Sequence, residues 1–110
     1  MQRKLIGYCG VDSGQILLTD PCYLDKFKND EFVPNDPKNN NFSYSGACYA
    51  TMSDDKGGQL KNDKGIDIAV AVSTGIGDGS YPVYAEYEDT GKGTGREDIR
   101  VKRVIIEFLN

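Results

Sequence analysis

Three aspartates at turns are the side chains of this chain best placed to do chemistry. Asp12, Asp20 and Asp78 each stand next to Ser, Pro or Gly, between apolar segments. Carboxylates and loop carbonyls together can bind a cation, but calcium loops place acidic residues at alternating positions, and the loop GIGDGS around Asp78 holds one. Turn aspartates commonly bind their own backbone amides instead, so the sequence predicts no metal site and no cofactor.

The thiol of Cys22, in the segment TDPCYL, is a second reactive group. A reactive thiolate needs a cationic or dipolar neighbour that lowers its pKa, and the nearest charge in the sequence is Asp20, which acts in the opposite direction. Cys22 is therefore expected to be structural. It would belong to a turn in which the Asp20 carboxylate caps exposed amides and ends the preceding strand.

Seven tyrosines and no tryptophan supply rigid rings with polar tips, which suit both sheet margins and pockets for planar ligands. Tyrosines beside the glycine-rich loop could line a pocket together with the acidic turns. The sequence therefore predicts ligand-binding residues and no catalytic residue. The predicted ligand-binding residues are Asp12, Asp20, Cys22, Tyr23, Gly77, Asp78, Gly79, Tyr81 and Tyr84.

The tripeptide Asp12-Ser13-Gly14 is similar to the active-site signature of retropepsin-like aspartic peptidases. Those enzymes are small, all-β dimers in which two carboxylates share one proton. They usually follow the glycine with a small residue and carry an apolar-apolar-Gly element late in the chain, whereas here Gln15 follows and VIIEF lacks the glycine. A strand-joining turn is the favoured interpretation, and a retropepsin-like peptidase is the third functional hypothesis.

Composition and charge exclude several classes of protein. The chain has no histidine, which rules out Ser-His-Asp and Cys-His nucleophile systems and His-ligated metals. Its formal charge of -4 repels nucleic-acid polymers, which are not expected as partners. The basic residues near the C-terminus are expected on the solvated side of a strand; they are Arg96, Arg100, Lys102 and Arg103.

The sequence also gives expectations about location. No apolar run approaches the roughly 18 residues needed to span a bilayer, and the N-terminal segment lacks the apolar core of a signal peptide. The three cysteines, Cys9, Cys22 and Cys48, are odd in number and lack C-x-x-C spacing, which fits reduced thiols. We expect a cytoplasmic protein that makes no use of a membrane.

Period-two alternation of apolar residues, interrupted by Gly, Asn and Asp, predicts an all-β fold. The expected architecture is a compact antiparallel β-sandwich or partly open barrel of about six strands, in a single domain over residues 1–110, with a surface excursion at 24–41. The expected strands are Lys4–Cys9, Gln15–Thr19, Phe42–Met52, Ile66–Thr74, Tyr81–Tyr87 and Ile99–Leu109.

The segment Ile66–Thr74 is the clearest of these strands. Its large residues Ile66, Ile68, Val70 and Val72 share one face, which is expected to be core. The opposite face carries small residues and could lie against another layer or under a ligand. The glycine-rich segment 75–80 is expected to join this strand to Tyr81–Tyr87 as a hairpin.

The last expected strand changes the phase of its alternation between Val101 and Val104. One inserted residue shifts every following side chain to the other face, so the sequence predicts a β-bulge near Lys102 and Arg103.

Three segments in this order resemble a family of small uncharacterised proteins from bacteria and their phages. They are VDSG, five residues, then DPCY (Val11–Tyr23); TGIGDGSYPVY (Thr74–Tyr84); and RVKRVIIEF (Arg100–Phe108). The resemblance implies a compact β domain and assigns no catalytic residue. A phage source would add one role, the sequestration of a host signalling nucleotide or metabolite.

These observations favour a non-enzymatic module that binds a small molecule or ion, in preference to an enzyme. The polar, glycine-rich and tyrosine-rich segments are expected to converge, with Asp20 and Asp78 as the central pair. The alternative is a structural or protein-interaction β domain that acts through a strand edge or a homodimer face.

Overall fold

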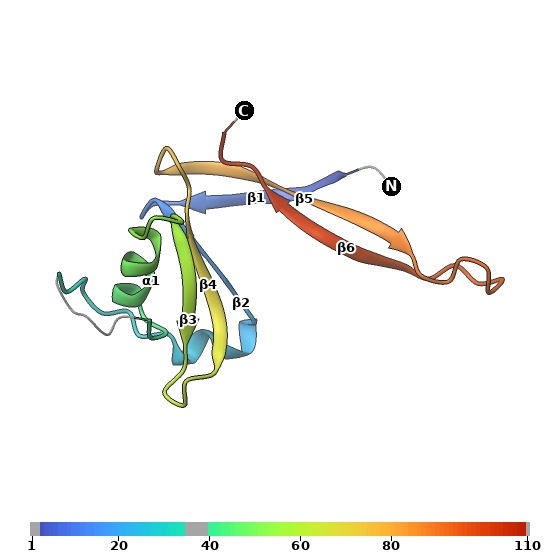
Figure 1. Ribbon diagram of the computed structural model, residues 1–110. Helices are drawn as coiled ribbons and strands as arrows, with labels where there is room; N and C mark the ends of the chain where they lie inside the picture. The colour runs from blue at the N-terminus through green and yellow to red at the C-terminus, as the bar shows by residue number, and fades with distance from the viewer. Residues whose placement is uncertain (1–2, 35–39, 110) are drawn as a thin grey trace. The chain divides into compact units, whose positions relative to one another are not determined.

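The computed structural model describes residues 3–34 and 40–109. This part of the chain is mostly β, with six strands in two three-stranded antiparallel sheets and no closed barrel (Figure 1), so the predicted all-β class is confirmed. The chain divides into two compact units: the first combines the segment up to Val11 with the segment from Gly79 onward, and the second is Asp12–Asp78.

The first unit is a sheet in the order β1-β5-β6. Its strands are β1 (Lys4–Val11), β5 (Gly79–Asp89) and β6 (Ile99–Ile106). The central strand β5 pairs antiparallel with both neighbours, for example at Tyr81 with Cys9 and at Ala85 with Val104. Figure 1 shows β5 and β6 continuing into the long loop at 90–98.

The predicted bulge in β6 is confirmed. Glu86 pairs with Arg103 and Tyr87 pairs with Val101, so Lys102 is the extra residue. The bulge returns Ile99 and Val101 to the face that carries Val104, as the change of phase requires. This apolar stripe of β6 is nevertheless exposed, with 44% of Ile99, 57% of Val101 and 55% of Val104 accessible to solvent.

The opposite face of the first sheet is charged. Glu86 lies between Arg3, at 4.0 Å, and Arg103, at 3.1 Å, and Lys102 lies 3.9 Å from Glu88. The Arg3 guanidinium also lies 5.3 Å from the centre of the Tyr84 ring. The basic residues of β6 thus form its solvated side, as expected, and are paired with carboxylates.

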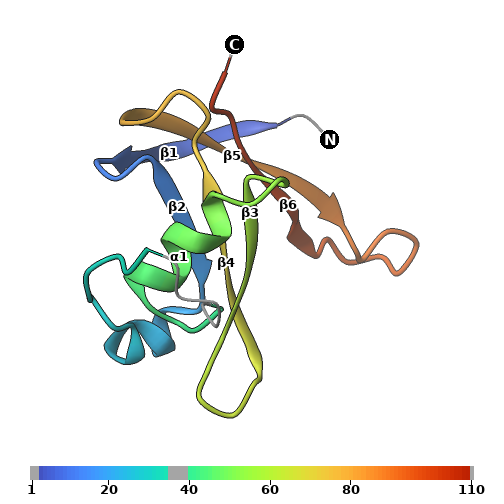
Figure 2. The same ribbon diagram turned by 60° about the vertical axis from the view of Figure 1, so that its left-hand side comes forward.

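The second unit is a sheet in the order β2-β4-β3 with a helix against one face. Its elements are β2 (Gln15–Thr19), η1 (Pro21–Lys26, a 3-10 helix), α1 (Tyr44–Thr51), β3 (Gly57–Lys61) and β4 (Asp67–Ser73). Figure 2 shows α1 crossing the face of this sheet. The buried core of the unit consists of Phe42, Ala47, Leu60, Ala69 and Ala71.

The strand predicted at Phe42–Met52 is wrong, because most of this segment forms α1. Ser43 is its N-cap, and the Ser43 hydroxyl accepts a hydrogen bond from the backbone amide of Gly46 at 3.0 Å. Gly46 lies so close to the preceding segment that a Cβ there would stand 2.1 Å from the Asn41 carbonyl oxygen. The alternation of apolar residues in this segment does not reflect a strand. The Ser43 cap and the close packing at Gly46 favour a helix instead.

The predicted core face of β4 is wrong except at Ile68, which is half-buried and packs against the core. Ala69 and Ala71, on the face of small residues, are buried beneath α1, whereas Val70 on the other face is 40% exposed and Ile66 is 55% exposed. Small side chains allow the helix to approach the sheet closely, which fits the expectation that this face could lie against another layer. The partner strand β3 was missed because its sequence, GGQLK, has no apolar alternation.

The predicted hairpin between β4 and β5 is wrong as well. β4 pairs with β2 and β3, whereas β5 pairs with β1 and β6, so the glycine-rich segment connects the two sheets. Thr74 holds this connection: its hydroxyl donates to the Gly77 carbonyl at 2.5 Å, and its amide donates to the Gly14 carbonyl at 3.0 Å.

The expected excursion at 24–41 begins with the end of η1 and returns through isolated bridges from Lys28 to Ser43 and from Asn41 to Lys61. Its part at 35–39 lies outside the described residues. Over residues 3–34 and 40–109, no helix has the length and apolar character needed to cross a membrane.

Candidate ligand-binding site

The structure places the predicted aspartates at two ends of one ladder. Gln15 at the start of β2 pairs with Ser73, and Thr19 at its end pairs with Ala69. Asp20 therefore lies at one end of the ladder, and the loop of Asp78 at the other. Because a strand rises roughly 3.3 Å per residue, roughly 15 Å of strand separates them. The expected pair of Asp20 and Asp78 is not formed.

Asp12 lies at the same end as Asp78. The two glycine turns approach closely, since a Cβ on Gly14, which has φ +70°, would stand 3.7 Å from the Cα of Gly77. Asp12 and Asp78 are both exposed. Among the described residues, no three Cys, Asp or Glu side chains are grouped so that they could share a metal ion.

Gly79, Tyr81 and Tyr84 lie on β5 in the first unit. Tyr81 is buried and packs edge-on against Phe108, with ring centres 5.4 Å apart. Tyr84 lies on the other face of the strand, beside Arg3. The two tyrosines thus point to opposite faces and do not line one pocket.

Asp20 has the capping role expected of it, and Cys22 takes part in the cap through its backbone amide while its side chain is exposed. Asp20 is the N-cap of η1, and its carboxylate accepts a hydrogen bond from the amide of Cys22 at 3.0 Å. Desolvation, the hydrogen bond to Asp20, and the charges of Asp20 and Asp25 raise the pKa of the Cys22 thiol. A raised pKa keeps the thiol protonated and weakly nucleophilic.

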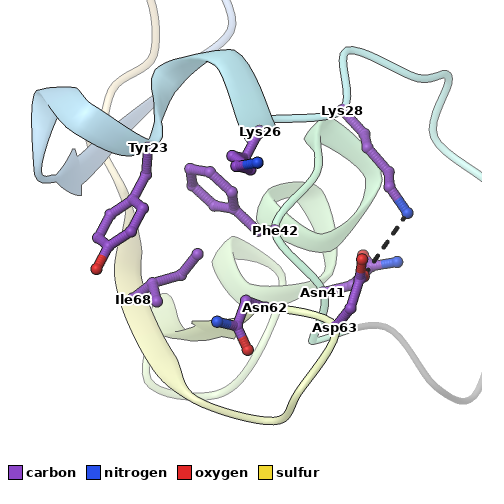
Figure 3. A pocket seen from close by; sticks show the side chains of 8 residues that line it. All are labelled: Tyr23, Lys26, Lys28, Asn41, Phe42, Asn62, Asp63 and Ile68. Atoms are coloured by element: carbon purple, nitrogen blue, oxygen red, sulfur yellow. Dashed lines mark ion pairs between the residues drawn. The ribbon is translucent and has the colours of Figure 1, made fainter.

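Tyr23 is the predicted site residue that lines a cavity. Figure 3 shows the side chains that line this cavity beneath η1. The volume of the cavity is about 170 Å³. Its walls come from four separate stretches of the second unit: η1 with the residues that follow it to Lys28, the segment around Asn41, the turn after β3, and β4. The lining residues are Tyr23, Lys26, Lys28, Asn41, Phe42, Asn62, Asp63 and Ile68.

The floor of this cavity is apolar and fixed. Phe42 is 5% exposed, and its ring packs edge-on against Phe27 with ring centres 5.2 Å apart. Ile68 packs against the same core. Tyr23, 36% exposed, stands at the side of the cavity in Figure 3, so a flat ligand would meet an aromatic wall and an aromatic floor.

The rim of the cavity presents hydrogen-bond donors. The side-chain oxygen of Asn62 accepts from the amides of Lys64 and Ile66, at 2.9 and 3.0 Å, and that of Asn41 accepts from the Ser43 hydroxyl at 2.6 Å. With their oxygens occupied, the two asparagines keep their amide nitrogens as donors.

Two lysines and one aspartate carry the charge of the rim. The Lys28 ammonium lies 3.9 Å from the Asp63 carboxylate, and both side chains are mostly exposed, so their attraction is weak. Lys26 forms no ion pair within residues 3–34 and 40–109. The lining is therefore net positive, although the whole chain is acidic.

A second, more open cavity of about 340 Å³ lies in the same unit, between η1, β2 and α1. Its lining is mainly apolar and includes Leu24 and Phe27, with Ser13, Gln15 and Tyr44 as polar members. A hydrogen bond with Cys48 raises the pKa of the Tyr44 hydroxyl, which stays protonated at neutral pH. This cavity offers fewer groups that could orient a ligand.

The sequence did not predict seven of the eight lining residues as ligand-binding residues. Phe42 and Ile68 stand in expected strands, and the other five stand in the excursion at 24–41 or in the turn after β3. No spacing connects Lys26 with Asn62 before the chain has folded. The one usable signal was Tyr23, next to the recognised turn at Asp20. The four segments that line the cavity meet only when the chain has folded, and local sequence patterns do not predict which segments will meet.

The fold and the cavity define a small all-β protein whose helix-covered sheet carries a pocket with an aromatic floor and a positive rim. The chain belongs to the family described as "Protein of unknown function (DUF4241)", whose model matches residues 4–94. This match includes every residue of the pocket and ends before β6. No curated protein and no solved structure matches the chain.

Proposed function

We propose that the protein is a binding module for a small organic molecule, which occupies the pocket beneath η1. The observation that carries this proposal is the combination of a buried aromatic floor, Phe42, with a rim of donors from Asn41 beside it, from η1 and from the turn after β3. Pockets that orient ligands typically combine an apolar lining with a few convergent polar groups.

The volume of the pocket favours a ligand of about one ring. A cavity of about 150 Å³ is large enough to hold benzene, whereas most pockets for larger ligands measure roughly 300–1,000 Å³. At about 170 Å³ the pocket fits one ring and would leave most of a nucleotide outside. Sequestration of a host signalling nucleotide, and a phage source, stay predictions from the sequence.

Ligand-observed NMR with a library of one-ring compounds and nucleotides tests the proposal. Tyr23→Ala removes one wall of the pocket and is expected to abolish the saturation-transfer signal of the compounds that bind. Tyr8→Ala, which removes an exposed tyrosine of β1, is the matched control and should bind like the parent. Equal binding by Tyr23→Ala and the parent would contradict the proposal, as would a library without a single binder.

An interaction role is the second candidate, favoured by the exposed apolar stripe of the edge strand β6. Its occupant would be a second copy of the chain, because a twofold axis brings the same stripe to both sides of an interface. Analytical ultracentrifugation tests this role: a dimer that Val101→Lys converts to a monomer would support it, and a parent chain that stays monomeric would exclude it. No observation favours the peptidase, which remains a prediction.

A further inference from the structure

We infer that the ligand of the pocket beneath η1 carries a carboxylate on a flat apolar body, and that Lys26 is the residue that selects this charge. The inference rests on the proposed binding function and adds the chemical class of the ligand. It follows from three properties of the lining: its charge, its donors and its floor.

Charge comes first. Lys28 and Asp63 offset each other across the rim, which leaves the ammonium of Lys26 as the charge without a counterpart among the described residues. Figure 3 shows Lys26 beside the Phe42 ring, on the side opposite Asn62. A ligand over that ring would therefore meet a positive group at one edge, which favours an anion.

Donors decide what kind of anion fits. Lys26, Asn41 and Asn62 offer N–H groups, and an ionised carboxylate is a pure acceptor that can satisfy several of them at once. A cationic ligand would find a single carboxylate, that of Asp63, which is already beside Lys28. A neutral amide would bring donors of its own to a rim that already consists mainly of donors.

The site is less suited to a phosphate ester. Doubly charged phosphates are usually held by arginine forks or by successive backbone amides, as in glycine-rich turns. The lining contains no arginine, and the glycine-rich turns at Gly14 and Gly77 lie at the far end of the β2–β4 ladder. One lysine and two amide side chains match one negative charge.

The floor fixes the shape of the ligand body. Phe42 is held in place by Phe27 and by the core, so the part of its ring that borders the pocket is fixed rather than adaptable. With a volume of about 170 Å³ above it, a single aromatic ring fits this surface. An aromatic monocarboxylate is the class of compound that meets all three properties.

Benzoate is the probe for this class, and benzamide is its neutral counterpart of the same shape. In an amide-detected NMR titration of the full chain, both compounds should shift the signals of Tyr23, Lys26 and Asn62. Benzoate should bind about two- to fivefold more tightly than benzamide, which is the size of effect expected from a solvent-exposed charge pair. Added salt should remove this difference, since it screens the pair.

Lys26→Gln should lower the affinity for benzoate to that for benzamide and leave the affinity for benzamide unchanged. Lys64→Gln, which removes a lysine outside the lining, is the control and should bind both compounds like the parent. Equal affinities of the parent for the two compounds would overturn the inference and leave the binding proposal in place. If neither compound shifted the pocket signals, the binding proposal would be contradicted together with the inference.

Discussion

The two units of this protein use the same architecture, a three-stranded antiparallel sheet, in different ways. In the second unit a helix covers one face of the sheet, and the buried residues Phe42, Leu60 and Ala71 form a common core. In the first unit the described residues contain strands and loops without a helix, and ion pairs around Glu86 line one face of the sheet. The helix gives the second unit a buried core, and the pocket beneath η1 lies beside that core. We therefore propose the second unit as the one that binds a small molecule.

The difference predicts where the chain is most sensitive to the loss of apolar side chains. Leu60→Ala removes a side chain with no exposed surface and should lower the free energy of unfolding by about 2–5 kcal/mol. Val101→Ala removes a similar side chain that is mostly exposed and should cost less than about 1 kcal/mol. Urea unfolding of both variants measures the contrast, and equal losses would show that the two units are packed alike.

Glycine substitutions test the same contrast in packing. Gly46→Ala places a Cβ 2.1 Å from the Asn41 carbonyl oxygen in the unit with the helix, so the backbone must move, at a cost of about 1–3 kcal/mol. Gly7→Ala, in β1, meets no atom within 4 Å and should change the free energy of unfolding little. Thermal unfolding of the two variants measures this difference. An unchanged melting temperature for Gly46→Ala would contradict the close approach of α1 to Asn41.

Ion pairs should matter in the first unit, though less than a core residue matters in the second. Glu86→Gln removes the carboxylate that Arg3 and Arg103 share, and should lower the free energy of unfolding by about 1 kcal/mol or less. Because salt screens such pairs, the loss should shrink at high ionic strength. A salt-independent loss would indicate that Glu86 contributes through packing instead.

The smallest expected effect concerns the loop between β5 and β6. The hydrogen bond from Arg100, and then that from Thr90, lower the pKa of Asp98 below its ordinary value of 3.8. The ionised Asp98 carboxylate therefore stabilises the folded state. This contribution is complete above pH 3.8 and is lost as the pH falls through the lowered pKa. Asp98→Asn should remove this acid-dependent loss of melting temperature, while Asp54→Asn, in the second unit, should retain it.

Local chemistry predicted part of this structure well. The strand Gln15–Thr19, the cap at Asp20 and the bulge at Lys102 were all predicted from the sequence, because each depends on neighbouring residues. The helix α1 was missed because the alternation of its apolar residues resembles that of a strand, although Ser43 is a good N-cap. Apart from Ile68, the buried face of β4 is the opposite of the predicted one, because the helix α1 covers the face that carries Ala69 and Ala71.

The candidate site was harder to predict than the fold. The expected convergence of Asp20 with Asp78 failed because β2 runs straight between them, so its length keeps the two turns apart. The pocket depends instead on Lys26, Phe42 and Asn62, which come together only when η1, the segment before α1 and the turn after β3 meet. Contacts between segments that lie far apart in the sequence depend on the topology of the fold, and neither composition nor residue spacing predicts them.

Mapping of bound compounds by amide chemical shifts, on the full chain, tests the central claim most directly. One-ring compounds that bind are expected to shift the signals of Tyr23, Lys26, Phe42 and Asn62, and to leave the strands β1, β5 and β6 unchanged. Shifts confined to β6, or spread over the first sheet, would contradict the assignment of ligand binding to the helix-covered sheet of the second unit.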